Sequence, residues 1–157
     1  MSSIPNDADE TLDNLWLGNI KVANDPVFFR NHNIDMVINC TDDIPFPDFY
    51  SSYHIQAVRF PLSSVDTKKN NYLLARKIDD VERILNDALK RGKHVLVHCF
   101  EGRQRSATLI AYHIMKRITS YDCPRTLAFL RKCRPIALTP APAFDWFFLQ
   151  KCKGMKK

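Results

Sequence analysis

The segment from Val95 to Ser106 constrains the fold more than any other part of this chain. Val95-Leu96-Val97-His98 is a run of aliphatic and β-branched residues, which predicts a short buried strand. Cys99 and five loop residues follow, and then Arg105-Ser106 begins an apolar pattern with helical spacing. A loop that curls into the start of a helix directs successive backbone N–H groups inward and forms an anion site. The segment therefore predicts a strand, an anion-binding loop and a helix.

The chemistry of this loop depends on Cys99 and Arg105. Helix N-termini and positive neighbours lower the pKa of a cysteine thiol from about 8.5 to roughly 3.5–7.5, so we expect Cys99 to be a thiolate nucleophile. The guanidinium of Arg105 is planar and suited to holding phosphate oxygens in pairs. A nucleophile, an anion cradle and an arginine clamp within one short segment predict a phosphate-ester hydrolase.

Several segments resemble one known family. His98-Cys99, Gly102 and Arg105-Ser106-Ala107-Thr108 match the signature loop of the cysteine-dependent protein tyrosine phosphatase superfamily, and the small atypical dual-specificity phosphatases are the most similar branch. Further similar segments are Leu15–Asn19 and Asp35–Cys40, which match early strands, and Arg134-Pro135-Ile136, which matches the segment before the last helix. The resemblance covers about Thr11 to about Leu149.

The resemblance implies a set of roles around the loop. The residues expected to bind the phosphate are Phe100, Glu101, Gly102, Arg103, Gln104 and Arg105. Cys99 is expected to form a phosphocysteine, and Ser106 is expected to hydrogen-bond its sulfur and to cap the helix. His98 is expected to support the loop from behind, or to be an ordinary core histidine. Gly102 is expected to adopt a conformation that other residues avoid.

A proton donor for the leaving group is expected on a separate loop. The family places an aspartate just after the strand that precedes the long helix, and Asp66 occupies that place here. The same residue then acts as a base toward water. Asp42, Asp43 and Asp48 are competing acids in another loop, where turn formation and solvation account for them, and Asp66 is the preferred acid.

Three positions depart from the common family pattern. Glu101 stands where alanine is frequent, and it is expected to brace Arg105 or a neighbouring N–H or to tune the charge of the loop. Arg103 adds a second positive charge, which favours a strongly acidic substrate. The segment Pro140–Phe144 lacks the Pro-Asn pair that commonly begins the last helix. Three other branches that share the cysteine–arginine spacing fit less well. Low-molecular-weight phosphatases carry the loop near the N-terminus, and rhodanese-like phosphatases lack an aspartate in a separate upstream loop. The RNA 5′-phosphatase branch typically has a His-Gly pair in the loop, which Phe100-Glu101-Gly102 does not match.

The remaining pattern predicts an α/β fold in one domain. Strands alternate with helices, so we expect a central, mostly parallel twisted sheet of about four to five strands flanked by helices. One long helix is predicted from about Asn71 to Arg91, and others follow Asp25-Pro26, Arg105 and Ser120, with a short one at Phe144–Cys152. The expected organisation is a flexible N-terminus (1–10), a catalytic domain (11–152) and a basic tail (153–157).

Composition adds limits on environment and partners. The net charge is +6, and we expect its clusters, Arg134 included, to be mostly solvated surface. No stretch is long and apolar enough to span a bilayer, no secretory signal is present, and the five cysteines lack metal-ligand spacing. We therefore expect reduced thiols, no metal or other cofactor, and a cytoplasmic location that extends to the nucleus.

The sequence thus predicts a protein phosphatase that hydrolyses phosphotyrosine and phosphoserine or phosphothreonine through a phosphocysteine. Its partners are phosphorylated proteins. Two alternatives stay open. The first is hydrolysis of RNA 5′ ends or phosphoinositides, because the positive net charge favours binding to nucleic acid or anionic lipid. The second is a module of this fold that binds phosphoproteins without turnover. Oligomeric state and physiological substrate are not determined by the sequence, nor is any disulfide partner of Cys99.

Overall fold

A five-stranded sheet in the order β1-β2-β5-β3-β4 forms the centre of the computed structural model, which describes residues 4–154. Its strands are β1 (Ala8–Leu12), β2 (Leu15–Gly18), β3 (Met36–Asn39), β4 (Gln56–Arg59) and β5 (Val95–His98). β1 runs antiparallel to β2, and every other pairing is parallel. The predicted mostly parallel sheet is confirmed.

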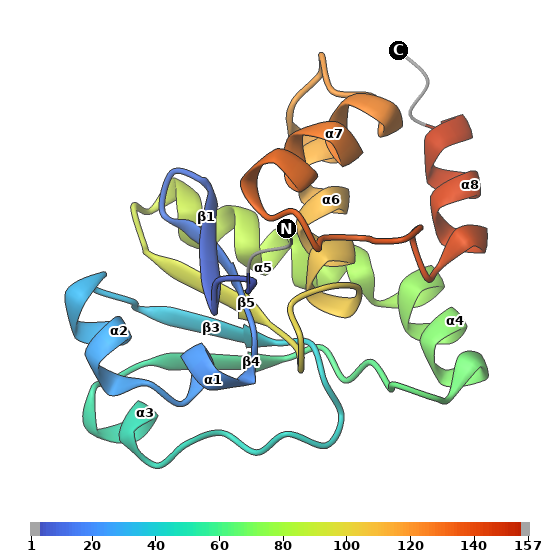
Figure 1. The fold of residues 1–157 in the computed structure, drawn as a ribbon. Helices are drawn as coiled ribbons and strands as arrows, with labels where there is room; N and C mark the ends of the chain where they lie inside the picture. The colour runs from blue at the N-terminus through green and yellow to red at the C-terminus, as the bar shows by residue number, and fades with distance from the viewer. Residues whose placement is uncertain (1–3, 155–157) are drawn as a thin grey trace.

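Helices cover both faces of this sheet (Figure 1). One face carries α1 (Ile20–Ala23), α2 (Pro26–Asn31) and α3 (Phe49–Ser52), and the opposite side carries α4 (Thr67–Arg76), α5 (Ile78–Lys90), α6 (Arg105–Arg117), α7 (Cys123–Cys133) and α8 (Asp145–Gly154). Successive strand residues point to opposite faces of the sheet, so their side chains pack in different hydrophobic clusters. Ile38 packs in the larger cluster, whereas Val37 packs with Val22 and Phe29 in the smaller one. No helix within residues 4–154 is long and apolar enough to cross a membrane.

The long helix predicted over Asn71–Arg91 is two helices. Lys77 ends α4 and begins α5, with φ −121° and ψ −18°. Leu74 and Ile78 are both buried in the same core, so the apolar spacing continues across the break. The spacing of the apolar residues in the sequence is the same on both sides of Lys77, so it could not reveal that the segment forms two helices.

Both ends of the predicted domain need correction. Residues 8–10, expected to be flexible, lie in β1 and pair with β2. α8 runs to Gly154, so the first two residues of the predicted tail are helical. Residues 4–7 precede β1 and belong to neither a helix nor a strand, and residues 1–3 and 155–157, also parts of the predicted end segments, lie outside the described part of the chain.

The cysteines also differ from expectation. Cys123 and Cys152 form a disulfide that joins α7 to α8, with their Cα atoms 5.6 Å apart, so the prediction of reduced thiols is wrong for this pair. Their spacing in sequence gives no sign that α8 folds back onto α7. Cys40, Cys99 and Cys133 are free thiols. Cys40 lies beside Cys99, because its N–H donates to the carbonyl of His98 at 2.8 Å across the two central strands.

Candidate active site

Cys99 immediately follows the central strand β5, at the carboxyl edge of the parallel strands, where ligands bind in open α/β sheets. Its side chain is buried, yet it lines the floor of an open pocket of about 400 Å³. The Oγ of Ser106, in the first turn of α6, lies 3.1 Å from the Sγ of Cys99. Strand, loop and helix therefore bring together the cysteine and the serine that the sequence singled out.

The carbonyl groups of the loop point away from this pocket. Each carbonyl from Cys99 to Gln104 accepts a hydrogen bond. The carbonyl of Cys99 accepts from His98 Nδ1, that of Phe100 from the N–H of Ile20, and those of Glu101 and Gly102 from Nη2 and Nε of Arg134. The carbonyl of Arg103 accepts from the N–H of Leu138, and that of Gln104 from the N–H and the hydroxyl of Thr108. The N–H groups of residues 100–104 donate to no protein acceptor within the described part of the chain. Because peptide N–H and C=O groups point in opposite directions, the unused donors are available to an anion.

Gly102 lets the loop pass close to β2. Its φ is +68°, and a Cβ atom there would lie 2.6 Å from the carbonyl oxygen of Gly18. Any side chain would therefore meet both a strained backbone and a steric clash. The prediction that this position excludes other residues is confirmed.

Arg134 holds the loop from beneath. Its guanidinium is 1% exposed and donates to the carbonyls of Glu101 and Gly102 at 2.9 and 2.8 Å. The same group bonds the carbonyl of Asn6 and the carboxylate of Asp9, both at 2.7 Å. The expectation that Arg134 belongs to the solvated surface is wrong. A buried arginine needs a paired carboxylate, and that partner comes from a strand that the sequence did not predict.

Gln104 compensates for the missing Pro-Asn pair. Its amide nitrogen donates to the carbonyls of Thr139 and Ala141 at 3.1 and 3.0 Å, and its amide oxygen accepts from the N–H of Ala143 at 2.8 Å. The loop and the segment before α8 are thus joined by one side chain. No sequence pattern we considered singled out this role.

Glu101 and Arg103 interact with each other at the rim. Arg103 Nε lies 3.4 Å from Glu101 Oε2, and its Nη1 donates to Thr139 Oγ1 at 2.8 Å. Glu101 therefore tunes the charge of the loop through Arg103 and does not brace Arg105. The charge of Arg103 is partly neutralised, which weakens the argument for a strongly acidic substrate.

His98 supports Cys99 from the core side. Its Nδ1 lies 3.1 Å from the carbonyl oxygen of Cys99, which can only accept, so Nδ1 carries the proton of the neutral ring. Burial lowers the pKa of His98 from 6.5 to about 4, and the nearby charges of Arg59 and Arg105 act in the same direction. The ring is therefore neutral at pH 7.

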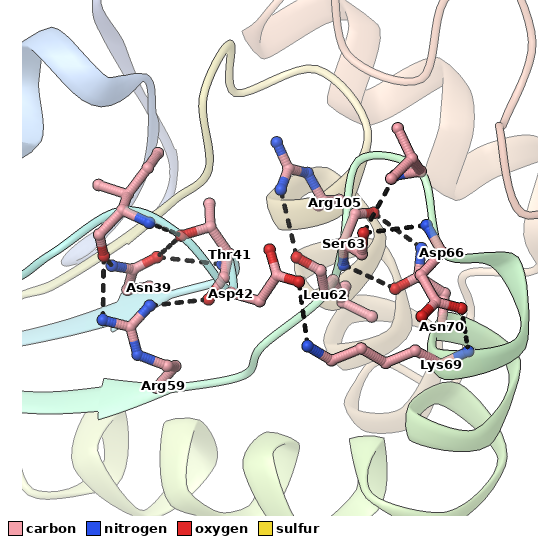
Figure 2. A network of polar contacts seen from close by, with 12 residues as sticks. Asn39, Thr41, Asp42, Arg59, Leu62, Ser63, Asp66, Lys69, Asn70 and Arg105 are labelled. Atoms are coloured by element: carbon pink, nitrogen blue, oxygen red, sulfur yellow. Dashed lines mark hydrogen bonds and ion pairs between the residues drawn. The ribbon is translucent and has the colours of Figure 1, made fainter.

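Arg105 connects the phosphate loop to the loop that follows β4. Its Nη1 donates to the carbonyl of Leu62 at 3.2 Å (Figure 2). The side chain also lines the pocket that contains Cys99. The guanidinium thus has donors left for a phosphate while one is used to position it. Its role as a phosphate clamp stays a prediction, with which this position is compatible.

Asp66 does not line this pocket. Its carboxylate accepts from the N–H of Lys69 at 3.0 Å and caps the N-terminus of α4, as Figure 2 shows. The hydroxyl of Ser63 accepts from the N–H groups of Val65 and Asp66, which fixes the turn before the helix. Ser64 is the residue of this turn that lines the pocket. The capping function of Asp66 was not part of the sequence-based expectation.

Asp43, one of the competing acids, does line the pocket. Its loop is held firmly, because Arg59 donates to the carbonyls of Thr41 and Ile44, both at 2.9 Å. Asp42 instead pairs with Lys69 at 3.0 Å, and this hydrogen bond lowers the pKa of its carboxyl. The lysine thereby joins the loops after β3 and β4 (Figure 2).

Comparison with known proteins identifies the family. The family model described as "Dual specificity phosphatase, catalytic domain" matches residues 15–149. The chain belongs to this family. It is a cysteine-dependent phosphatase catalytic domain, and the phosphocysteine mechanism is general to the family.

Relatives and solved structures agree with this assignment. The putative tyrosine phosphatase 123R of invertebrate iridescent virus 6 is 30% identical over 125 residues, which make up 80% of this chain and 78% of the viral protein. The human dual specificity protein phosphatase 16 is 30% identical over 135 residues, covering 86% of this chain but 19% of that protein. The crystal structure of human DUSP28 shares the fold, with a TM-score of 0.76 at 19% identity, over 99% of this chain and 97% of that one.

Proposed function

We propose that this protein hydrolyses phosphotyrosine and phosphoserine or phosphothreonine in proteins. The observation that carries the proposal is the set of outward-bonded carbonyls from Cys99 to Gln104, which leaves inward N–H donors beside a cysteine and an arginine. Such preorganised donors stabilise the equatorial oxygens of a phosphoryl group in the transition state. The pocket beside Cys99 is open, with a volume of about 400 Å³, and we infer that it admits phosphorylated side chains of different lengths.

In the first step, the sulfur of Cys99 forms a bond to phosphorus while the bond from phosphorus to the substrate oxygen breaks. The leaving oxygen takes a proton from an acid, and we assign Asp66 this role after movement of the turn that holds it. Asp43 is the alternative because it already lines the pocket. In the second step the carboxylate of the same acid takes a proton from water, the water oxygen forms a bond to phosphorus, and the bond between phosphorus and sulfur breaks. The hydroxyl of Ser106, whose Oγ lies 3.1 Å from the sulfur, stabilises the departing thiolate.

Hydrolysis of a small aryl phosphate by the wild type and by Cys99→Ser tests the catalytic part of the proposal. We expect the variant to lose more than ~10³-fold in kcat, since the covalent intermediate no longer forms. Arsenate or tungstate binding, followed by thermal shift, checks that the variant keeps its fold and its anion site. A folded, reduced and inactive wild type that binds phosphopeptides would point instead to a binding module.

Matched phosphotyrosine and phosphothreonine peptides test the substrate class. Rates within about tenfold of each other support dual specificity. Short 5′-phosphorylated RNA and phosphoinositide vesicles are the competing substrates, which the net charge of +6 favours. Faster turnover of either one than of both peptides contradicts the proposal. We propose a cytoplasmic and nuclear location, where a reducing environment keeps Cys99 a free thiol; the disulfide between Cys123 and Cys152 argues in the opposite direction, so measuring the location of the tagged protein in cells tests this proposal.

A further inference from the structure

A second pocket adjoins the catalytic one. It has a volume of about 540 Å³ and shares Ser64, Glu101, Gln104 and Arg105 with the pocket that contains Cys99. The two cavities therefore adjoin, and a peptide whose phosphate reaches Cys99 can place its neighbouring residues in the second cavity. Successive residues of an extended peptide are about 3.3 Å apart, so the next one or two side chains come within reach of it.

The far wall of this second pocket is apolar and held in place. Phe144, just before α8, and Trp146, in the first turn of α8, line it together with Val65 from the turn before α4. Trp146 is 40% exposed, so part of its indole is available for contact. Gln104 fixes the approach to α8 through its three bonds to residues 139–143, and the wall is thereby linked to the phosphate loop.

The charged groups of the second pocket are mainly acidic. Glu101 and Asp145 line it, and Asp145 has no ion-pair partner among the side chains that the structure describes, those of residues 4–152. The carboxylate of Glu101 is 59% exposed, and its ion pair with Arg103 is long at 3.4 Å. Arg105 is the positive group of the lining, and a bound phosphate neutralises it. Once a substrate phosphate is in place, the pocket therefore presents a net negative charge beside aromatic rings.

We propose that this pocket binds an arginine or lysine side chain of the substrate, located one or two residues from the phosphorylated residue. The aliphatic stem packs on Phe144 and Trp146, as long basic side chains do on apolar surfaces, and the cation faces Asp145 and Glu101. The proposal rests on the proposed function and specifies its substrates: phosphoproteins with a basic residue next to the phosphorylated site.

A panel of phosphopeptides tests this proposal, with arginine, leucine or glutamate placed in turn at positions −2 to +2 around one phosphotyrosine. We expect kcat/KM to be roughly fivefold higher for arginine than for leucine at one or two positions, and lowest for glutamate. The preference should weaken as salt is raised. Asp145→Lys should reverse the order of arginine and glutamate at those positions. Asp13→Asn, a charge change at an exposed turn far along the chain, is the control that keeps the wild-type order.

Each peptide rate is divided by the same variant's rate on a small aryl phosphate, so damage to folding or to the catalytic loop cancels. Equal rates for all three residues, or an order that Asp145→Lys leaves unchanged, would overturn the proposed pocket while leaving the phosphatase intact. A preference for leucine or glutamate in the wild type overturns it as well. Absence of aryl phosphate hydrolysis refutes the proposed function itself, so the two failures are distinguishable.

Discussion

The phosphate loop (99–105) and the acid loop (62–66) meet at Arg105, but they are held in different ways. The phosphate loop is anchored by groups from distant parts of the chain, among them the buried Arg134 and Leu138 and the partly buried Ile20. The acid loop is stabilised mainly by the hydroxyl of Ser63 and by the side-chain amide of Asn70. The amide oxygen of Asn70 accepts from the N–H of Ser63 at 2.7 Å, and its amide nitrogen donates to the carbonyl of Ser63 at 2.8 Å. One loop is fixed by tertiary structure and the other by local turns.

This difference separates nucleophilic attack and phosphate binding, which use the phosphate loop, from protonation of the leaving group, which uses the acid loop. The nucleophile and the anion site are preorganised, so they need no rearrangement when substrate binds. Asp66 caps a helix and reaches the pocket only if the turn from Ser63 moves. Such movement is common for catalytic acids, which often approach their substrate only in the complex.

The largest effect is expected at Arg105, the residue that both loops share. Arg105→Lys keeps the positive charge but loses the planar pair of donors, one of which also holds the carbonyl of Leu62. We expect kcat/KM on an aryl phosphate to fall about 10³-fold, with kcat reduced more than KM is raised. A fall of less than tenfold would mean that a point charge suffices and that the two loops are not coupled through the guanidinium.

The next effect separates the two candidate acids. Asp66→Asn keeps the helix cap, because asparagine is an equally good N-cap residue, but it removes the proton. We expect a loss of about 10² in kcat with phenyl phosphate and little loss with dinitrophenyl phosphate, whose leaving group needs no proton. Asp43→Asn is the matched variant on the rigid loop and should affect both substrates equally. The reverse pattern assigns the acid to Asp43 and means that no loop movement is required.

The same contrast explains what the sequence could and could not predict. Cys99, Arg105 and Ser106 are close in sequence, so a strand–loop–helix pattern places them together without knowledge of the rest of the fold. Arg134 and Gln104 act on segments that lie 30 residues or more away, and only the folded chain shows their partners. Asp66 caps the helix that follows it, which is a local feature. Aspartate is common both as a helix cap and as a catalytic acid, so the residue type alone does not tell the two roles apart.

The phosphate loop should also be the more acid-sensitive of the two. Because the pKa of His98 is lowered to about 4 in the folded protein, the unfolded chain takes up the proton first as pH falls below 6.5. The stability from this group is full above pH 6.5 and is lost as pH falls toward 4. We expect His98 to account for about 2 kcal/mol of the loss in unfolding free energy between pH 6.5 and 5.

Urea unfolding of the wild type and of His98→Asn over this pH range measures that contribution. Asparagine retains an N–H that can reach the carbonyl of Cys99, and it does not titrate. The variant should therefore show a flatter pH dependence, whereas His54→Asn, at an exposed position with φ +57°, should keep the wild-type slope. Parallel slopes for His98→Asn and the wild type would show that the loop tolerates a charged imidazole beneath it.

The smallest effect is expected at Ser106, where the phosphate loop acts on the second chemical step. Ser106→Ala removes one hydrogen bond to the sulfur at a fully buried position, without adding volume. A hydrogen bond to a charged group contributes about 1.5 kcal/mol, so breakdown of the phosphocysteine should slow about tenfold while its formation changes little. Rapid mixing with an aryl phosphate should then show a burst of product that the wild type lacks. If both steps slow equally, Ser106 acts by holding the loop in shape, and the hydroxyl has no separate role toward the leaving thiolate.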